Sequence, residues 1–512
     1  MSVLPADPHL PVAHLRPPRN WLNDPNGLAF HDGHYHVLFQ YNPYGPEHAN
    51  VHWGHFRSPD LLTWEELPVA LSPTPGGEDA DGCYSGNAVS DGDRMVAFYS
   101  AFRADRWAQP VTTAASTDGG RTWTPRGSLL IPEPPPGVSM YRDPYVWREG
   151  GRWRMLVGSA LTDGRAGALL YESADLEQWH YRGPFLDQAP QPVAPGADTG
   201  LGWECPQYLH TPDGRGALIL SAWDPELGPQ RTVVYAGHEQ DGRFVAGVPA
   251  LFDHGPDLYA PALLPAPDGR WLLWGWSWEA RDQQWAKEAG WAGLLSLPRE
   301  VALGEDGSVR QQPAAELLSL RDGRALTASG ETSSTAVLGT VDASFDLTAR
   351  LELHAVGGGL RLVTSADGSE FLDIRIDPAT GELVVDRDRA SLDPRAHRGT
   401  YRMPCPEAKT ASGAAVELRL VVDRSVAELY LPSGRTLTLR FYPTGNGPWR
   451  IEAHAEGESH ATGESHAAGE DHATGDSHAA GEGRLGYTVA AWNLRPYTMR
   501  REAEASARPA LA

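Results

Sequence analysis

The chain has 512 residues, 41% of them hydrophobic and 21% charged, which is enough for two to four globular domains with packed cores. Acidic residues outnumber basic ones by 66 to 43, and the formal net charge is −23. A charge of this sign repels phosphate backbones and anionic membrane surfaces. We therefore expect neither nucleic acid nor a membrane as a partner, whereas a neutral small molecule is compatible with the charge.

The three cysteines are few and far apart, at Cys83, Cys205 and Cys405. Their spacing fits neither a disulfide framework nor a zinc site. The first 20 residues lack the basic and apolar segments of a secretory signal, and no stretch approaches the roughly 20 apolar residues of a membrane span. These features predict a soluble, cytoplasmic protein, and we expect no metal and no cofactor.

A hairpin pattern recurs five times between residues 27 and 278. Each copy is an alternating apolar segment, a turn rich in Asp, Glu and Gly, and a second apolar and aromatic segment, which is typical of a β-hairpin. The acids of the five turns recur every 55 to 64 residues, at Asp32, Asp91, Glu149, Asp213 and Asp268. A second motif recurs in the same register and ends at Trp64, Trp123 and Trp179. Two hairpins per repeat make a four-stranded sheet, so we predict an all-β fold with a five-bladed β-propeller over residues 1–305, in preference to a sandwich with accidental regularity.

The aromatic-rich period stops near residue 299, and residues 306–333 are predicted to be a linker. Between residues 334 and 500, short alternating strands with Gly turns every 8 to 12 residues predict an antiparallel β-sandwich, followed by a tail at 501–512. A six-residue repeat at 457–483 has no apolar face and is predicted to be a loop. Its four histidines could bind a transition metal, but low complexity without a ligand role is the favoured interpretation.

Carboxylates occur at equivalent points of four of the five repeats, just before the hairpin turn. They are Asp24 in WLNDPNG, Asp143 in YRDP, Glu204 in WECP and Asp257 in DLY. In a propeller the innermost strands line the central axis, so these side chains are expected to converge. Carboxylates that converge among Trp and Tyr, without lysine, are what glycoside cleavage requires, because one acts ionised and another acts protonated.

Each acid taken singly also has a structural explanation. Asp24 beside Asn and Pro is typical of a turn, Asp143 could form an ion pair with Arg142, and Glu204 could lie at a strand edge. The shared phase of the repeat favours a common functional site. Cys205 is expected to be a small buried side chain.

The motifs resemble the successive blocks of glycoside hydrolase family 32, the β-fructosidases. The resemblance is carried by WLNDPNGL, FQYNP, WGH, YSG, YRDP, WECP and WAGLLSLPRE, and it covers residues 10 to 300 strongly and the sandwich more loosely. That family is a five-bladed propeller followed by a β-sandwich. The resemblance implies that Asp24 is the nucleophile, Glu204 the general acid and base, and Asp143 the stabiliser of the transition state, with Arg142 supporting the acids.

The same resemblance implies a fructose pocket around the three acids. Its expected members, besides Arg142, are Asn23, Gln40, Trp53, Tyr84, Ser85, Tyr259 and Trp276. Tyr84 departs from the Phe of that block, which affects only the packing of the pocket.

The sequence predicts a retaining β-fructofuranosidase whose partner is a small carbohydrate, sucrose or a short fructoside. A fructosyltransferase or a hydrolase of inulin or levan on the same scaffold stays an alternative, and a carbohydrate-binding protein without activity is a remote one. Cleavage of phosphorylated sucrose lacks an obvious basic cluster, although Arg103 and Arg106 could lie near the rim. The oligomeric state is not predicted.

Overall fold

The computed structural model describes residues 7–354, 357–409, 414–445, 447–456 and 483–501. The six-residue repeat up to residue 482, with its four histidines, and the tail after Arg501 lie outside the described residues. The fold is all-β, as predicted. Within the described ranges the only α-helix is α1 (Gln283–Ala289), which Asp282 caps by accepting from the backbone N–H of Trp285, and two 3₁₀ turns span Ala315–Leu320 and Pro406–Lys409.

The chain forms two compact units that are discontinuous in sequence. The first comprises residues 1–322, 423–440 and 494–512, and the second comprises residues 323–422 and 441–493. The segment 423–440 lies inside the stretch that the sequence assigns to the second domain, but it packs with the first unit. The units therefore do not follow from a single cut in the chain.

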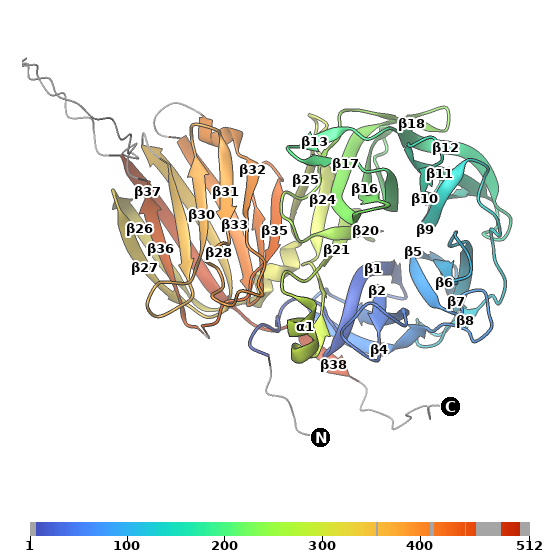
Figure 1. Cartoon of the computed structure of the whole chain (residues 1–512), viewed down its shortest axis with the longest axis horizontal. Helices are drawn as coiled ribbons and strands as arrows, with labels where there is room; N and C mark the ends of the chain where they lie inside the picture. Colours follow the sequence, from blue (N-terminus) through green and yellow to red (C-terminus); the bar gives the residue numbers. More distant parts are fainter. Residues whose placement is uncertain (1–6, 355–356, 410–413, 446, 457–482, 502–512) are drawn as a thin grey trace, which may run out of the picture. The chain divides into compact units, whose positions relative to one another are not determined.

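The first unit contains five antiparallel sheets that begin with consecutive hairpins (Figure 1). The first sheet has the order β22 (Trp291–Ala292), β1 (Asn20–His31), β2 (His34–Asn42), β3 (His52–Ser58), β4 (Thr63–Leu71) and β38 (Thr498–Arg501), with β22 and β38 parallel to their neighbours. The second has the order β5 (Gly82–Asp91), β6 (Arg94–Phe102), β7 (Val111–Ser116) and β8 (Thr124–Pro125). The third has the order β9 (Val138–Glu149), β10 (Arg152–Leu161), β11 (Ala166–Ser173) and β12 (His180–Gln188).

The last two of the five sheets carry short additional strands. The fourth has the order β15 (Gly202–His210), β16 (Arg215–Asp224), β17 (Gly228–Gln240) and β18 (Arg243–Ala246), with β19 (Ala250–Leu251) on β17. The fifth has the order β20 (Tyr259–Pro265), β21 (Trp271–Ser277), β24 (Arg299–Leu303) and β25 (Val309–Pro313), with β23 (Leu294–Leu295) on β21. A separate hairpin pairs β13 (Pro192–Ala194) with β14 (Ala197–Asp198).

The five sheets close a ring. The first strands of consecutive sheets, β1, β5, β9, β15 and β20, contact one another in that order, and β20 contacts β1 again. All five hairpins predicted from the acidic turns are present, as β1–β2, β5–β6, β9–β10, β15–β16 and β20–β21. The sheets bury aromatic and aliphatic clusters between them, for example Trp147, Trp203 and Phe185 between the third and fourth.

The predicted tryptophan repeat marks the turn that leads into the fourth strand of three sheets. In each, the indole Nε1 donates to the backbone carbonyl three residues earlier, at 3.0 Å: Trp64 to Leu61, Trp123 to Gly120 and Trp179 to Leu176. A serine and an aspartate two residues apart precede each tryptophan and bond within the turn. The repeat is therefore a turn that each sheet builds from its own residues.

The second unit contains two antiparallel arrays of strands. One has the order β27 (Thr335–Val341), β36 (Trp449–Ala455), β29 (Gly358–Val363), β30 (Phe371–Asp377), β31 (Glu382–Asp386) and β32 (Thr400–Pro404). The strands of the other sheet that lie in this unit have the order β26 (Arg321–Thr332), β37 (Arg484–Leu494), β28 (Ser344–His354) and β33 (Ala414–Asp423). Apolar residues alternate along β28, where Leu347, Leu351 and Leu353 are buried.

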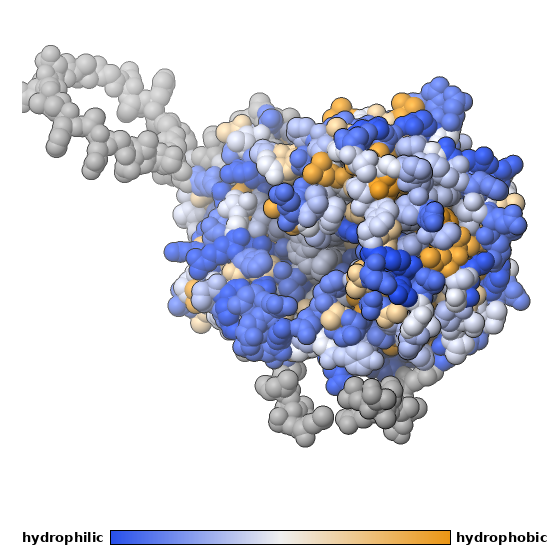
Figure 2. All heavy atoms as spheres, turned by 45° about the vertical axis from the view of Figure 1, so that its right-hand side comes forward, coloured by the Kyte–Doolittle hydropathy of each residue, from blue (hydrophilic) through white to orange (hydrophobic). Residues whose placement is uncertain are grey.

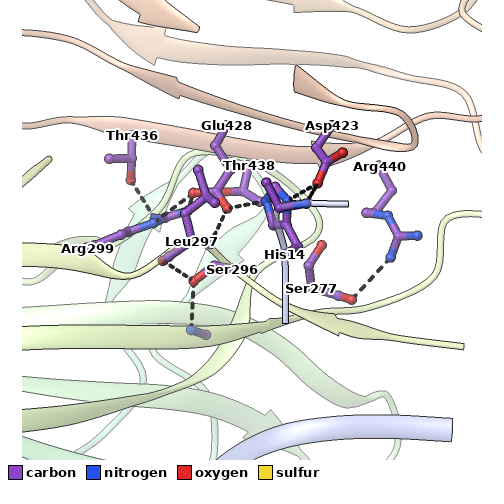
Figure 3. Close-up of polar contacts among 12 residues, drawn as sticks. His14, Ser277, Ser296, Leu297, Arg299, Asp423, Glu428, Thr436, Thr438 and Arg440 are labelled. Atoms are coloured by element: carbon purple, nitrogen blue, oxygen red, sulfur yellow. Dashed lines mark hydrogen bonds and ion pairs between the residues drawn. The ribbon is translucent and has the colours of Figure 1, made fainter. Parts of the chain in front are cut away.

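The segment 423–440 completes the first unit with the hairpin of β34 (Val426–Tyr430) and β35 (Thr436–Arg440). A fully buried charge network ties the hairpin to both ends of the ring sequence (Figure 3). Asp423 accepts from His14 Nδ1 at 2.8 Å, and Glu428 accepts from Arg299 Nη2 at 2.8 Å. Burial lowers the pKa of His14, but its two carboxylate partners outweigh that effect and raise the pKa overall.

The face drawn in Figure 2 is mainly hydrophilic, and its hydrophobic residues form small groups. This agrees with the excess of acidic residues. Among the described helices, none is long and apolar enough to cross a membrane.

Candidate active site

Each of the five inner strands breaks its hairpin register at the same point, before the turn. The irregularities lie after Leu22, Tyr84, Glu204 and Tyr259, and at Asp143 in β9, where Arg142 and Pro144 pair with consecutive residues of β10. Such a bulge bends the strand and turns a side chain away from the regular alternation. Asp143, Cys205 and Ala260 have positive φ angles of 65°, 45° and 45° at these positions. Local backbone irregularity therefore aims the predicted site residues toward one end of the ring.

Asp24, in β1, is held by a relay of side chains from neighbouring strands. Gln40 Nε2 donates to Ser85 Oγ, and the Ser85 hydroxyl donates in turn to Asp24 Oδ2. Asn23 Oδ1 accepts from the backbone N–H of Asp24. Four of the predicted residues, Asn23, Asp24, Gln40 and Ser85, are thus in direct contact.

Asp143 and Asp24 both lie next to the thiol of Cys205. Cys205 Sγ lies 3.6 Å from Asp143 Oδ2 and 3.7 Å from Asp24 Oδ2, and the Cys205 backbone N–H donates to Asp143 Oδ2 at 3.1 Å. The bulge in β15 gives Cys205 this position, next to Glu204. Cys205 is buried, as predicted, but it also separates the two aspartates of the site.

Glu204 is the acid with the strongest donors. Arg142 Nη2 lies 2.7 Å from Glu204 Oε1 and Arg142 Nε donates to the same oxygen at 2.9 Å, while Tyr259 Oη donates to Oε2 at 2.6 Å. The guanidinium of Arg142 also lies 4.9 Å above the ring of Trp223. Arg142 therefore pairs with Glu204, and not with Asp143 as one structural interpretation of the sequence supposed.

Two of the three acids, Asp24 and Asp143, have raised pKa values. Burial, with repulsion from Asp143 and Glu204, raises the pKa of Asp24 to about 8, although the Ser85 hydrogen bond opposes this. Burial and Glu204 raise the pKa of Asp143 to about 6, against the pull of Arg142. A cluster of this kind holds a shared proton at neutral pH, and its titration steps belong to the cluster as a whole.

The other predicted pocket residues lie around this cluster in different ways. Tyr84 stacks on Phe102 at 4.4 Å between ring centroids. Trp276 packs with Tyr259 and Cys205, and its Nε1 has no hydrogen-bond partner within the described ranges. Trp53 has no exposed surface, and its Nε1 donates to the Cys83 carbonyl at 3.1 Å. Trp53 is therefore a fully buried residue that binds the backbone of β5.

Asp257, the acid of the fifth repeat, does not join the cluster. Its Oδ1 accepts from Trp278 Nε1 at 3.1 Å and its Oδ2 accepts from the backbone N–H of Arg440 at 2.8 Å. The expected convergence of four acids is wrong for this residue, because the bulge after Tyr259 places the tyrosine, and not the aspartate, at the site.

Sequence reasoning missed a set of buried serines on the second strand of four of the five hairpins. Ser100 Oγ accepts from the Asp143 backbone N–H at 2.7 Å and donates to the Ser85 carbonyl at 3.0 Å. Ser221 Oγ accepts from the Ala260 backbone N–H at 3.1 Å. The available signal was the recurrence of serine at one phase of these strands, at Ser100, Ser159, Ser221 and Ser277.

Comparison with known proteins agrees with this arrangement. Residues 14–313 match the glycosyl hydrolases family 32 N-terminal domain, and residues 316–468 match the glycosyl hydrolases family 32 C-terminal domain. The chain belongs to glycosyl hydrolase family 32.

Named relatives cover most of the chain. A raffinose invertase of Escherichia coli is 30% identical over 456 residues, which span 85% of this chain and 89% of the relative. A sucrose-6-phosphate hydrolase of Klebsiella pneumoniae is 31% identical over 456 residues, which span 86% and 90%. The solved structure of fructan 1-exohydrolase IIa from Cichorium intybus has the same fold, with a TM-score of 0.80 at 22% identity over 98% of this chain and 100% of that one.

Proposed function

We propose that the chain is a retaining β-fructofuranosidase that releases fructose from sucrose or a short β-fructoside. The observation that carries this is the convergence of Asp24, Asp143 and Glu204 from three different sheets on one buried site, with Cys205 between the aspartates. Membership of family 32 and the names of its relatives support hydrolysis of β-fructosides as the activity.

In the proposed mechanism Asp24 attacks the anomeric carbon of the fructosyl unit, while Glu204 protonates the departing glycosyl oxygen. Glu204 then takes a proton from water, and the water cleaves the fructosyl ester on Asp24. Arg142 and Tyr259 stabilise Glu204 after it has given up its proton, since both donate to its carboxylate. Asp143 accepts hydrogen bonds from fructose hydroxyls, which strengthen as positive charge develops on the ring.

The fold proposal follows from the closed ring. We propose that the five sheets are the blades of a β-propeller, predicted from the sequence over residues 1–305, and that the second unit is the β-sandwich domain predicted over 334–500. The predicted linker 306–333 contains β25, the last strand of the fifth sheet, and β26 of the second unit. The contact of β20 with β1 supports ring closure, and the two strand arrays of the second unit support the sandwich. The hairpin of β34 and β35 is an exception, because it packs with the first unit.

A second candidate is cleavage of sucrose 6-phosphate, the substrate in the name of several relatives. Arg103 follows β6 at the same end of the hairpin as Tyr84 and Ser85. Its guanidinium is paired with Asp105 at 2.6 Å, and that of Arg106 is paired with Glu78 at 3.0 Å. Because both cations are already compensated by carboxylates, we favour the unphosphorylated substrate.

A substrate panel followed by proton NMR separates these candidates. The panel contains sucrose, sucrose 6-phosphate, 1-kestose, inulin and levan. We expect fastest release from sucrose, with β-fructofuranose as the first product. A kcat/KM at least tenfold higher for the phosphate ester would assign the phosphorylated substrate. Trisaccharide as the main product at high sucrose would instead indicate a transferase.

The matched variant for the same assay is Asp24→Asn, which keeps the shape of the side chain but cannot form the ester. We expect turnover of sucrose to fall by about four orders of magnitude or more, as for other lost nucleophiles. Sucrose should still bind, as measured by isothermal titration. Release of fructose at a rate near wild type would contradict the assignment of Asp24.

Cytoplasmic location is also a proposal. Cys83, Cys205 and Cys405 are buried and form no disulfide within the described residues, which is compatible with a reducing compartment. Fractionation of the source cells, with activity measured in each fraction, tests it.

A further inference from the structure

A series of side-chain contacts connects Glu204 to the β34–β35 hairpin. Tyr259 Oη donates to Glu204 Oε2 at 2.6 Å, and the Tyr259 ring stacks on Trp278 with centroids 5.3 Å apart and an interplanar angle of 20°. Trp278 Nε1 donates to Asp257 Oδ1 at 3.1 Å. Asp257 Oδ2 accepts from the Arg440 backbone N–H at 2.8 Å, so the series ends in the β34–β35 hairpin.

The Arg440 end of this series of contacts is fixed by hydrogen bonds and close backbone packing. Arg440 has no exposed surface, and its guanidinium donates to the carbonyl oxygens of Ser425 at 3.0 Å and Ser277 at 3.3 Å; Figure 3 shows the second of these contacts. Thr438 donates its backbone N–H to Asp253 at 2.8 Å. A Cβ atom on Gly255 would lie 1.8 Å from the Thr438 carbonyl oxygen, so the two backbones are in close contact.

The Tyr259 hydroxyl has two acceptors but only one proton. Besides Glu204 Oε2, the backbone carbonyl of Ala222 lies 2.9 Å from Tyr259 Oη. The O–H bond can rotate toward either acceptor, so the position of the ring relative to each acceptor decides which one receives the better hydrogen bond. Burial, with the nearby Glu204 charge, holds the pKa of Tyr259 well above its usual value, so the hydroxyl stays protonated and acts as a donor.

We propose that Trp278 and Asp257 are positioning residues that aim the Tyr259 hydroxyl at Glu204. Trp278 fixes the plane of the tyrosine ring, and Asp257 fixes Trp278 by binding its indole N–H. Arg440 anchors Asp257, so a segment almost 200 residues away in sequence supports the acid and base. The inference rests on the proposed role of Glu204.

The consequence for catalysis is a pH effect. A donor on the Glu204 carboxylate stabilises its ionised form, so loss of the donor makes proton release from Glu204 harder. The alkaline limb of kcat/KM should then move to higher pH, and the second step, in which Glu204 acts as a base, should change as well.

The test compares four variants on sucrose over a full pH range. Tyr259→Phe removes the hydroxyl, Trp278→Phe keeps a stacking ring but removes the indole N–H, Trp278→Leu removes both, and Trp179→Phe is the control, since its indole N–H serves only a turn. We expect the alkaline limb to move upward by about half a pH unit or more in Tyr259→Phe and Trp278→Leu, and by less in Trp278→Phe. kcat/KM at the optimum should fall about tenfold in Tyr259→Phe, the loss expected for a hydrogen bond to a charged group. Trp179→Phe should leave the limb unchanged.

The double variant Tyr259→Phe/Trp278→Leu gives the decisive result. If Trp278 acts through the hydroxyl, its effect on the limb disappears once the hydroxyl is gone. Equal shifts from Trp278→Leu in the presence and absence of the hydroxyl would overturn the proposal, as would no shift from Trp278→Leu. Absence of any shift in Tyr259→Phe would instead contradict the role of Glu204.

Asp257→Asn tests the contact between Trp278 and the β34–β35 hairpin. The amide keeps an acceptor for Trp278 but places an NH₂ group toward the backbone N–H of Arg440, so we expect a limb shift as large as that in Trp278→Phe. Circular dichroism and thermal unfolding are measured alongside. A folded Asp257→Asn protein with the wild-type pH profile would remove Asp257 from the proposal.

Discussion

Asp24 is buried where a charge is costly, and the proposed function requires that charge. Its neighbours are two further carboxylates, a thiol and a serine hydroxyl, and burial is the largest cause of its raised pKa. Glu204, by contrast, has the guanidinium of Arg142 and the hydroxyl of Tyr259 as donors. Asp24 therefore gives up its proton less readily than a free aspartate, and the titration steps belong to the cluster as a whole.

Because a buried charge on Asp24 costs free energy, we predict that Asp24→Asn stabilises the fold. The pKa of Asp24 is raised from 3.8 to about 8, so the folded state binds more protons than the unfolded state between these values, and this group makes stability fall as the pH rises from about 4 to 8. The asparagine lacks this contribution. We expect its free energy of unfolding at pH 7 to exceed that of wild type by about 2 kcal/mol or more, from urea unfolding, with a difference that grows between pH 4 and 8. A constant or negative difference would contradict the raised pKa.

At the scale of elements, the bulged inner strands depend on the strands beside them. Ser100, in β6, satisfies the backbone N–H of Asp143 and the carbonyl of Ser85, both from strands that break their register at the site. The hydroxyl thus couples two bulges in adjacent sheets. A bulge without such a partner would leave polar backbone groups buried and unsatisfied.

Ser100→Ala should therefore reduce activity and stability together. We expect kcat/KM on sucrose to fall about tenfold and stability to fall by about 1 to 3 kcal/mol, because two buried polar groups lose a partner. Ser159→Ala is the matched control: Ser159 is equally buried at the same phase of β10, but its hydroxyl donates to the Gly167 carbonyl within its own sheet. It should lose stability with little change in kcat/KM. Equal activity losses in both variants would show that Ser100 has no special role at the site.

At the scale of the whole molecule, the first unit is assembled from segments far apart in sequence. The side chains of His14 and Arg299 are fully buried, and their carboxylate partners Asp423 and Glu428 come from the late segment 423–440. Breaking a buried pair by removing one partner is strongly destabilising, because the other charge is left without compensation.

Truncation after Gln312 should therefore yield an unstable protein, even though the five inner hairpins of the ring stay in the chain. Loss of the hairpin leaves His14 without a carboxylate partner and Arg299 with only Asp253 and Gln311. Glu428→Gln is the smaller form of the experiment, and we expect it to cost about 3 to 5 kcal/mol in urea unfolding of the full chain. A soluble truncated protein with the wild-type melting temperature would contradict this account.

Much of the fold was accessible from the sequence because the repeated hairpins are local. A turn acid, its flanking apolar strands and the tryptophan turn lie within about 40 residues, and their recurrence predicted five hairpins that the structure contains. The second unit was predicted as alternating strands for the same reason. The grouping of residues 423–440 with the first unit was not predicted, because the alternation of a strand is the same whichever core it faces.

The sequence by itself determined the all-β class, the hairpin repeat and the phase at which Asp24, Asp143 and Glu204 occur, since each depends on neighbours close along the chain. Only the tertiary structure decided that Cys205 lies between the aspartates, that Arg142 pairs with Glu204, and that Tyr259 replaces Asp257 at the site. These contacts join residues 55 to 181 positions apart, and bulges set them. A bulge of one residue reverses the direction of a side chain without changing the sequence pattern, so periodicity locates the site but cannot say which side chains face each other.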